Sequence, residues 1–146
     1  MEHDPAREIV SSRVIDVPRE RVFKAFTDPA CLAKWWGPSG FTNTFETCDI
    51  RPGGAWRFVM HGPDGKYYPN ESVFREVVAP ERIVIEHLST PRFTLTATLA
   101  EEAGKTRLTW RGLFESAAVC AAVRVFAVPA NEQNFDRLQA ELAKMA

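Results

Sequence analysis

Residues 116–146 read SAAVCAAVRVFAVPANEQNFDRLQAELAKMA. In the second half of this stretch, apolar residues recur at steps of three and four between charged ones, which is typical of an amphipathic helix: Phe135, Leu138, Leu142 and Met145. The first half is apolar nearly all round apart from Arg124, which is typical of a helix buried on more than one side. Pro129 lies between the halves and predicts that the helix kinks or restarts there.

The composition limits the classes of protein. A chain of 146 residues predicts a single domain over residues 1–146, with residues 1–6 as a flexible tail. The 18 basic and 19 acidic residues form no basic run, so we expect no nucleic-acid partner. No apolar run reaches the roughly 20 residues of a bilayer span, and the polar N-terminus is unlike a signal peptide, so we expect no membrane insertion.

The cysteines and histidines give no sign of a metal site or a cofactor. Cys31, Cys48 and Cys120 are far apart and form no pattern with the three histidines that is typical of metal ligands. Three unpaired thiols suit a reducing compartment, so we expect a cytoplasmic protein. The sequence also lacks phosphate-binding and dinucleotide-binding glycine motifs.

Two short helices are predicted over residues 18–36. Pro18 suits the first position of a helix, and Asp28-Pro29 is a typical start for a second one. Gly37 stands where a helix commonly ends in a left-handed residue, and Pro38 prevents its continuation.

Strand patterns occupy most of the remaining chain. Alternating apolar and polar residues, separated by Pro- and Gly-rich turns, predict seven strands over residues 7–17, 44–51, 55–61, 66–78, 82–89, 92–100 and 105–115. A bulge is expected near Pro69 and Asn70. Ser116 is expected to cap the final helix.

The order β-α-α-β-β-β-β-β-β-α predicts an α+β fold. Short turns between the strands favour one antiparallel sheet of seven strands with one buried face. A helix is only about 10–12 Å wide, so such a sheet must curl around the C-terminal helix in a helix-grip arrangement. The expected inward aromatic rings either fill the space between sheet and helix or line a cavity there. Their residues, with neighbouring inward positions, are the candidate ligand-binding set: Trp36, Trp56, Phe58, Met60, Tyr68, Phe74, Ile85, His87, Phe93, Trp110, Phe114 and Phe126.

Several short motifs, in order along nearly the whole chain, carry a family resemblance. They are Pro18 to Phe23, Asp28-Pro29, Trp35-Trp36-Gly37-Pro38, Pro52-Gly53-Gly54, Pro63-Asp64-Gly65, Pro80 to Val84, Thr106 to Trp110 and Asp136-Arg137-Leu138. The sequence resembles the SRPBCC superfamily, also called START-like or helix-grip proteins. Within it, the sequence is similar to the branch named after the activator of the ninety-kilodalton heat-shock-protein ATPase. The resemblance implies a deep cavity between sheet and helix and favours the cavity over a filled core.

Three functions are compatible with these patterns. The first is binding of a small apolar or amphipathic molecule in the cavity, with an entrance near Pro129 and Gly37. The second is an enzyme of the cyclase, dehydratase or hydrolase type that uses His87 with an inward tyrosine or glutamate. No convincing catalytic set is found, so binding without catalysis is favoured. The third is a chaperone-interacting module that stimulates an ATPase, which ranks last because no exposed apolar stripe is predicted. Homodimer formation stays open.

Overall fold

A single curved sheet wraps around one long helix. The computed structural model describes residues 5–145, so residues 1–4 of the expected tail lie outside the described residues, whereas Pro5–Arg7 form a short 3-10 helix, η1. The other elements are, in chain order, β1 (Glu8–Ile15), α1 (Arg19–Thr27), α2 (Pro29–Trp35), β2 (Thr42–Cys48), β3 (Ala55–His61), β4 (Tyr67–Val78), β5 (Arg82–His87), β6 (Phe93–Glu102), β7 (Lys105–Phe114) and α3 (Ala117–Lys144).

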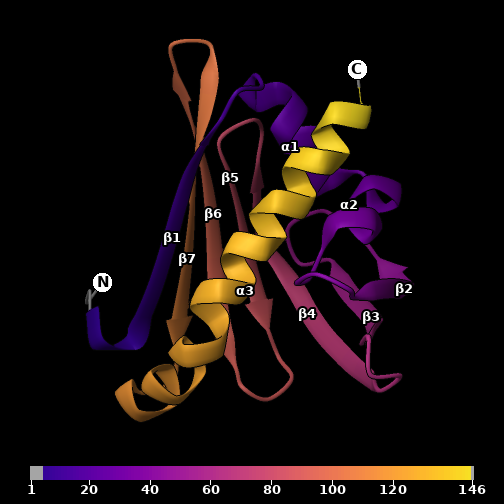
Figure 1. The fold of residues 1–146 in the computed structure, drawn as a ribbon, viewed down its shortest axis with the longest axis vertical. Coiled ribbons are helices and arrows are strands. Elements are labelled where there is room, and N and C mark those ends of the chain that lie inside the picture. The colour runs from indigo at the N-terminus through magenta and orange to yellow at the C-terminus, as the bar shows by residue number, and fades with distance from the viewer. Residues whose placement is uncertain (1–4, 146) are drawn as a thin grey trace.

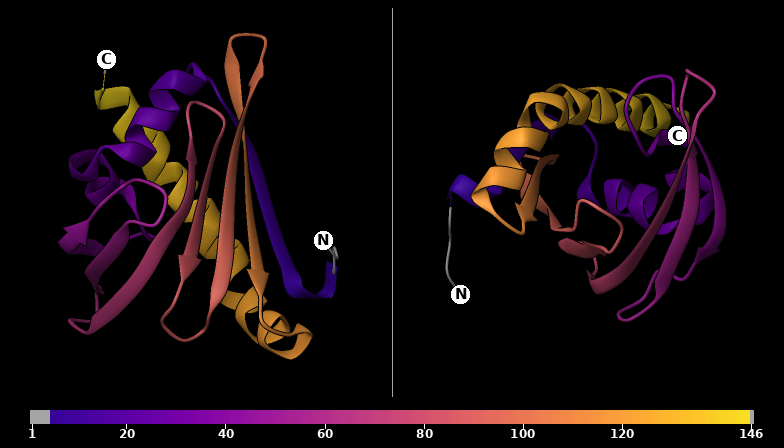
Figure 2. Two further views of the ribbon diagram at one scale, coloured as in Figure 1. Left: turned by 180° about the vertical axis from the view of Figure 1, so that it is seen from behind. Right: turned by 90° about the horizontal axis from the view of Figure 1, so that it is seen from below.

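All neighbouring strands pair antiparallel, in the spatial order β1-β7-β6-β5-β4-β3-β2 (Figure 1). Helix α3 crosses the concave face diagonally, α2 packs beside β2, and α1 packs against β6 and β7. The view along the strands shows how far the sheet curls around the helix (Figure 2). The predicted α+β helix-grip fold, with seven strands and two short helices after the first strand, is therefore confirmed.

The local signals at α2 also hold, whereas Pro18 stands just before α1 and not at its first position. The side chain of Asp28 accepts a hydrogen bond from the backbone N–H of Ala30 at 3.0 Å, which caps α2. Gly37 follows α2 with a φ of +100°, a backbone angle that glycine adopts without steric cost. The indole N–H of Trp35 donates to the carbonyl oxygen of Ala25 at 2.9 Å, so α1 and α2 form one packed unit.

The sheet departs from the predictions at β2 and β4. Strand β2 ends at Cys48, three residues early, because the backbone turns just after it: the N–H of Arg51 donates to the carbonyl oxygen of Asp49 at 3.0 Å. The register of β4 shifts between Phe74 and Glu76, and not near Pro69 as predicted. Pairing of β4 with β5 begins only at Ser72, so Pro69 pairs with β3 alone and has no strand on its other side. An edge position of this kind tolerates the missing N–H of proline without a bulge.

Helix α3 is one continuous helix, so a restart at Pro129 is wrong. The hydroxyl of Ser116 caps its first turn by accepting from the N–H of Val119 at 3.2 Å, as predicted. Figure 2 shows the axis turning between the orange first half and the yellow second half, so the proline is accommodated by a bend. Both halves are anchored by buried side chains, Cys120 in the first and Phe135 in the second.

The first half of α3 contradicts the predicted burial on several sides. Cys120 is fully buried, but Val125 and Phe126 are 72% and 74% exposed, and Val128 is 42% exposed. This part of the helix lies at the end of the sheet (Figure 1), where only one of its faces meets other elements. We call Val125, Phe126 and Val128 the exposed α3 patch. The expectation that the chain has no exposed apolar stripe is therefore also wrong.

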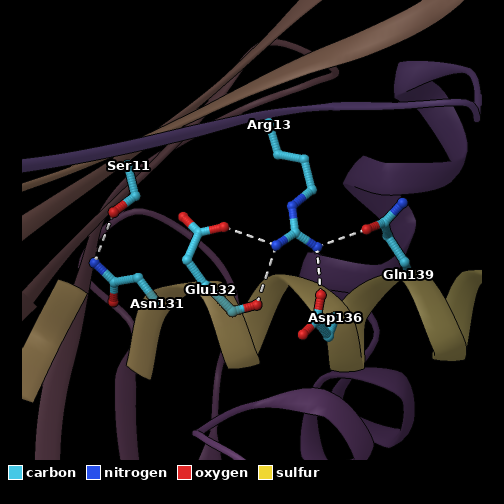
Figure 3. Close-up of polar contacts among 6 residues, drawn as sticks. All are labelled: Ser11, Arg13, Asn131, Glu132, Asp136 and Gln139. Atoms are coloured by element: carbon cyan, nitrogen blue, oxygen red, sulfur yellow. Dashed lines mark hydrogen bonds and ion pairs between the residues drawn. The ribbon is translucent and has the colours of Figure 1, made fainter. Parts of the chain in front are cut away.

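The second half of α3 is fastened to the edge strand β1 by Arg13 (Figure 3). The guanidinium of Arg13 donates to side-chain oxygens of Asp136 and Gln139 at 2.7 Å and of Glu132 at 2.8 Å. One residue before Glu132, the amide of Asn131 donates to the hydroxyl of Ser11 at 3.2 Å. These contacts hold the helix along the rim of the sheet and so fix one wall of the space beneath it.

Candidate functional site: an apolar cavity beneath the bend of α3

A cavity of about 230 Å³ lies between the sheet and the bent part of α3. Strands β1, β6 and β7 supply its floor, α3 supplies its roof, and the loop after α2 closes one side. The floor residues are Ile9, Phe93, Leu95, Trp110, Gly112 and Phe114, and the roof residues include Val123, Ala127, Ala130 and Asn131. Most of this lining is apolar, which is typical of a ligand pocket.

The cavity lies where two hydrophobic cores meet. The main core packs under the second half of α3 through Phe135 and Leu138. A smaller core of Ile9, Phe114 and Cys120 packs under the first half. Phe93 touches both cores. Small residues face the space between the cores, so it stays open where larger side chains would fill it.

A second recess of about 230 Å³ continues from the first toward β4 and β5. The two share the side chains of Trp36, Met60, Phe93 and Leu95. The second recess adds Phe58 and Ile85, and it also adds three polar residues, Asn70, Ser72 and His87. The site is therefore apolar under the helix and polar at one inner end.

Trp36 forms the wall between these two spaces. Its ring lies edge-on to Trp56 at 4.9 Å between centroids and tilted against Trp110 at 5.4 Å. Its backbone is held by Arg137 of α3, which donates to the carbonyl oxygens of Trp36 and Gly37 at 3.0 Å. The same guanidinium reaches the carbonyl oxygen of Pro38 at 3.1 Å. Burial lowers the pKa of Arg137, but its hydrogen bonds to the carbonyl oxygens replace the hydrogen bonds to water that burial removes.

Asn134 adds a second fastening between α3 and this loop. Its amide nitrogen donates to the carbonyl oxygen of Trp35 at 2.8 Å, and its amide oxygen accepts from the N–H of Gly37 at 3.3 Å. Asn134 is buried, and both ends of its side chain have partners. The position of Trp36 is thus set by residues about a hundred positions later in the chain.

His87 is the titratable residue of the site. Its Nδ1 lies 3.0 Å from the carbonyl oxygen of Pro91, and its Nε2 lies 2.8 Å from the amide oxygen of Asn70. The ring stacks on Phe93 with 4.7 Å between centroids. Burial lowers the pKa of His87, and backbone hydrogen bonds to Pro91 and Ser89 oppose that shift.

The structure brings eight of the twelve candidate residues to these spaces. Five of them line the first cavity: Trp36, Met60, Phe93, Trp110 and Phe114. Phe58, Ile85 and His87 line the second recess. Trp56 and Phe74 are fully buried and stack on each other at 5.4 Å, so they form core behind the lining.

Tyr68 and Phe126 lie away from the cavity. Tyr68 is 40% exposed, and its hydroxyl donates to Asp64 at 3.2 Å, because its end of β4 projects beyond the part that α3 covers. Phe126 is 74% exposed and lines neither space, although Val123 and Ala127 of the same helix segment line the first cavity. Helical periodicity could not show which face of such a uniformly apolar segment turns inward.

Other lining residues were missed by the sequence reasoning. Leu95 follows Phe93 by two positions, so the alternation of the strand already places it on the same inward face. Asn70 and Ser72 share the inward face of β4 with Phe74, and the same alternation could have found them. Ala127, Ala130 and Asn131 gave no signal, because only the bend of α3 decides that they face the cavity.

The surroundings of His87 lack the partners that the enzyme hypothesis named. Asn70 is the side chain within hydrogen-bond reach, whereas Tyr68 is at the surface. Glu86 lies on the convex face, where Arg75 and Arg92 lie 2.6 and 2.9 Å from its oxygens, and the hydrogen bond from Arg75 is the main cause that lowers the pKa of Glu86. Between residues 5 and 145, no three His, Cys, Asp or Glu side chains gather to hold a metal ion.

The curled sheet, the gripping helix and the cavity between them define a START-like, helix-grip domain. Residues 16–143 match the profile of the family described as Activator of Hsp90 ATPase homolog 1-like protein. The chain belongs to this family, as the resemblance of its motifs predicted. No curated protein matches the sequence. In the described part of the chain, no helix is both long and apolar enough to cross a membrane.

Solved structures share the fold at low sequence identity. A protein from Nitrosomonas europaea superimposes with a TM-score of 0.90 at 21% identity, with all of both chains covered. A protein from Chromobacterium violaceum gives 0.81 at 28% identity, covering 91% of this chain and 95% of that one. One from Arthrobacter aurescens gives 0.87 at 23% identity, covering 98% and 90%. This likeness concerns the fold and not the ligand.

Proposed function

We propose that the protein binds a small apolar or amphipathic molecule in the cavity between the sheet and α3. The observation that carries this proposal is an apolar space of about 230 Å³ at the junction of two cores, continued by a second of similar size. An apolar cavity of roughly 150 Å³ already holds benzene, so one space alone accommodates a ring with a short substituent. Burial of apolar ligand surface at about 25 cal/mol per Å² supplies the driving force.

Uptake of an uncharged fluorescent probe, N-phenyl-naphthylamine, tests the proposal. We expect saturable binding with a blue-shifted emission, because the dye leaves water for an apolar space. Ala127→Phe places a ring in the cavity and should abolish uptake. Ala121→Phe on the exposed face of the same helix is the matched control and should leave it unchanged. The absence of saturable dye uptake in the parent protein would contradict the proposal.

The exposed α3 patch supports a second candidate function, contact with a partner protein. Val125, Phe126 and Val128 present apolar surface to solvent on an ordered helix, a feature typical of interaction sites. The family description refers to activation of the Hsp90 ATPase. If this chain has such a role through the patch, it should raise the ATPase rate of an Hsp90 chaperone, and Phe126→Ser should abolish the rise. An unchanged chaperone rate would contradict this candidate and leave the cavity proposal intact.

A further inference from the structure

Three polar side chains gather at the inner end of the second recess. Ser72 of β4 pairs in register with His87 of β5, and Asn70 lies two residues before Ser72 on the same face. All three line the recess, whereas the rest of its lining is apolar. Ser72 is only 2% exposed, and its hydroxyl has no hydrogen-bond partner among residues 5–145. A hydroxyl that faces a cavity is suited to a polar group of a ligand.

The contacts of His87 favour a positively charged ring. A carbonyl oxygen cannot donate, so the Nδ1 that faces Pro91 must carry a proton. The amide of Asn70 is oriented by its own N–H donation to the carbonyl oxygen of Tyr68 at 2.7 Å, which turns its oxygen toward Nε2. In a neutral ring with the proton on Nδ1, Nε2 is an acceptor and would face the amide oxygen of Asn70, which is also an acceptor. If the Asn70 amide were turned around, its oxygen would instead face the carbonyl oxygen of Tyr68. A proton on both ring nitrogens removes this conflict.

A charged His87 would have no counter-charge in the recess. The lining from β3, β6 and the loop after α2 consists of Phe58, Met60, Phe93, Leu95 and Trp36, and β4 and β5 add only neutral side chains beside His87. The nearest carboxylates in the sequence, Glu71 and Glu86, belong to the convex face and pair there with arginines. A buried cation without a partner is unfavourable, so the recess favours an anion brought by the ligand.

We propose that the polar end formed by Ser72, His87 and Asn70 receives the carboxylate of a small amphiphile whose apolar body fills the cavity under α3. The inference rests on the proposed binding function and adds the chemistry of the ligand's head group. The Ser72 hydroxyl donates to one carboxylate oxygen, and the His87 imidazolium supplies the opposite charge. No covalent step is involved. The free ring, whose pKa burial lowers, takes up a proton as the carboxylate binds.

Calorimetric titration with phenylbutyrate and its neutral analogue phenylbutyramide tests this inference. The two ligands differ only in the head group. At a pH of about 6 we expect the carboxylate to bind about 10-fold tighter or more, as hydrogen bonds to charged groups imply. The preference should weaken at a pH of about 8, where a histidine is mostly neutral. In the NMR spectrum, the pKa of His87 should rise when phenylbutyrate saturates the protein and not when the amide does.

Two variants locate the effect. His87→Gln and Ser72→Ala should each reduce the preference for the carboxylate over the amide, while the far-UV circular dichroism spectrum shows that both variants are folded. Equal affinity for the two ligands, tighter binding of the amide, or binding of neither overturns the inference. Dye uptake without any head-group preference overturns the inference alone. A protein that takes up neither the dye nor either ligand loses both the inference and the proposed function.

Discussion

The guanidinium of Arg137 donates a hydrogen bond of 3.0 Å to the carbonyl oxygen of Trp36, across a separation of 101 residues. Arg137 comes from the gripping helix, and Trp36 is one of the side chains that line both cavities. A further hydrogen bond of Arg137, to the carbonyl oxygen of Lys34 at 2.9 Å, satisfies the end of α2. This single side chain therefore couples the position of α3 to the wall of the candidate site.

Replacement of Arg137 by alanine should destabilise the protein and loosen the cavity wall. Carbonyl oxygens at the end of α2 would lose a charged donor, and hydrogen bonds of this type contribute about 1.5–3 kcal/mol to the free energy of unfolding. We expect Arg137→Ala to lower that free energy by about 2 kcal/mol in a denaturant titration. Arg51→Ala, at an exposed turn position, should change it by less than about 0.5 kcal/mol. Equal losses in the two variants would contradict this role.

Gly37 should be required for the cavity as well as for the turn. A Cβ at this position would stand 2.7 Å from the methyl carbon of Met60, which lines both spaces. Gly104 has a similar φ of +80°, but a Cβ there would meet nothing within 4 Å, so Gly104→Ala is the matched control. Both changes to alanine should cost about 1–2 kcal/mol of stability through the left-handed backbone. Only Gly37→Ala should also weaken uptake of the uncharged dye, because Met60 must move; unchanged dye affinity would refute that link.

Cys48 should react slowly with thiol reagents. Burial, followed by the nearby charge of Asp49, raises the pKa of the Cys48 thiol to about 11. At a pH of about 8 the reactive thiolate is then about a thousandth of the total, so the rate should rise steeply with pH. A variant with Cys31 and Cys120 replaced by alanine isolates this thiol for a colorimetric assay. The same variant in denaturant is the control and should react at the rate of an ordinary cysteine; a fast reaction in the folded state would contradict the assignment.

Truncation of two phenylalanines on α3 should change the free energy of unfolding by very different amounts. Phe126 is 74% exposed, so Phe126→Ala should change the free energy of unfolding by less than about 0.5 kcal/mol. Phe135 is fully buried against Trp110, with 5.6 Å between ring centroids. Phe135→Ala should cost about 3–5 kcal/mol, since it removes apolar contacts and leaves a cavity. A large loss for Phe126→Ala in the isolated protein would mean that the patch is already covered, for example by a second copy.

Much of the fold could be predicted because its signals are local. The caps at Asp28 and Ser116 and the left-handed Gly37 depend on backbone groups within a few residues. Strand alternation likewise identified Phe58, Ile85 and Trp110 as inward residues, since successive side chains of a strand point to opposite faces. These patterns required no knowledge of distant elements.

The sequence by itself determined the order of the elements, the antiparallel sheet, the gripping helix and most of the inward side chains. Only the tertiary structure decided that α3 continues through Pro129, that Phe126 faces solvent and that Trp56 lies behind the cavity lining. The physical reason is that burial depends on what lies across from a residue. No sequence pattern near Phe126 indicates that the sheet ends beneath it. The cavity exists because the two cores lie apart, and no local pattern encodes that distance.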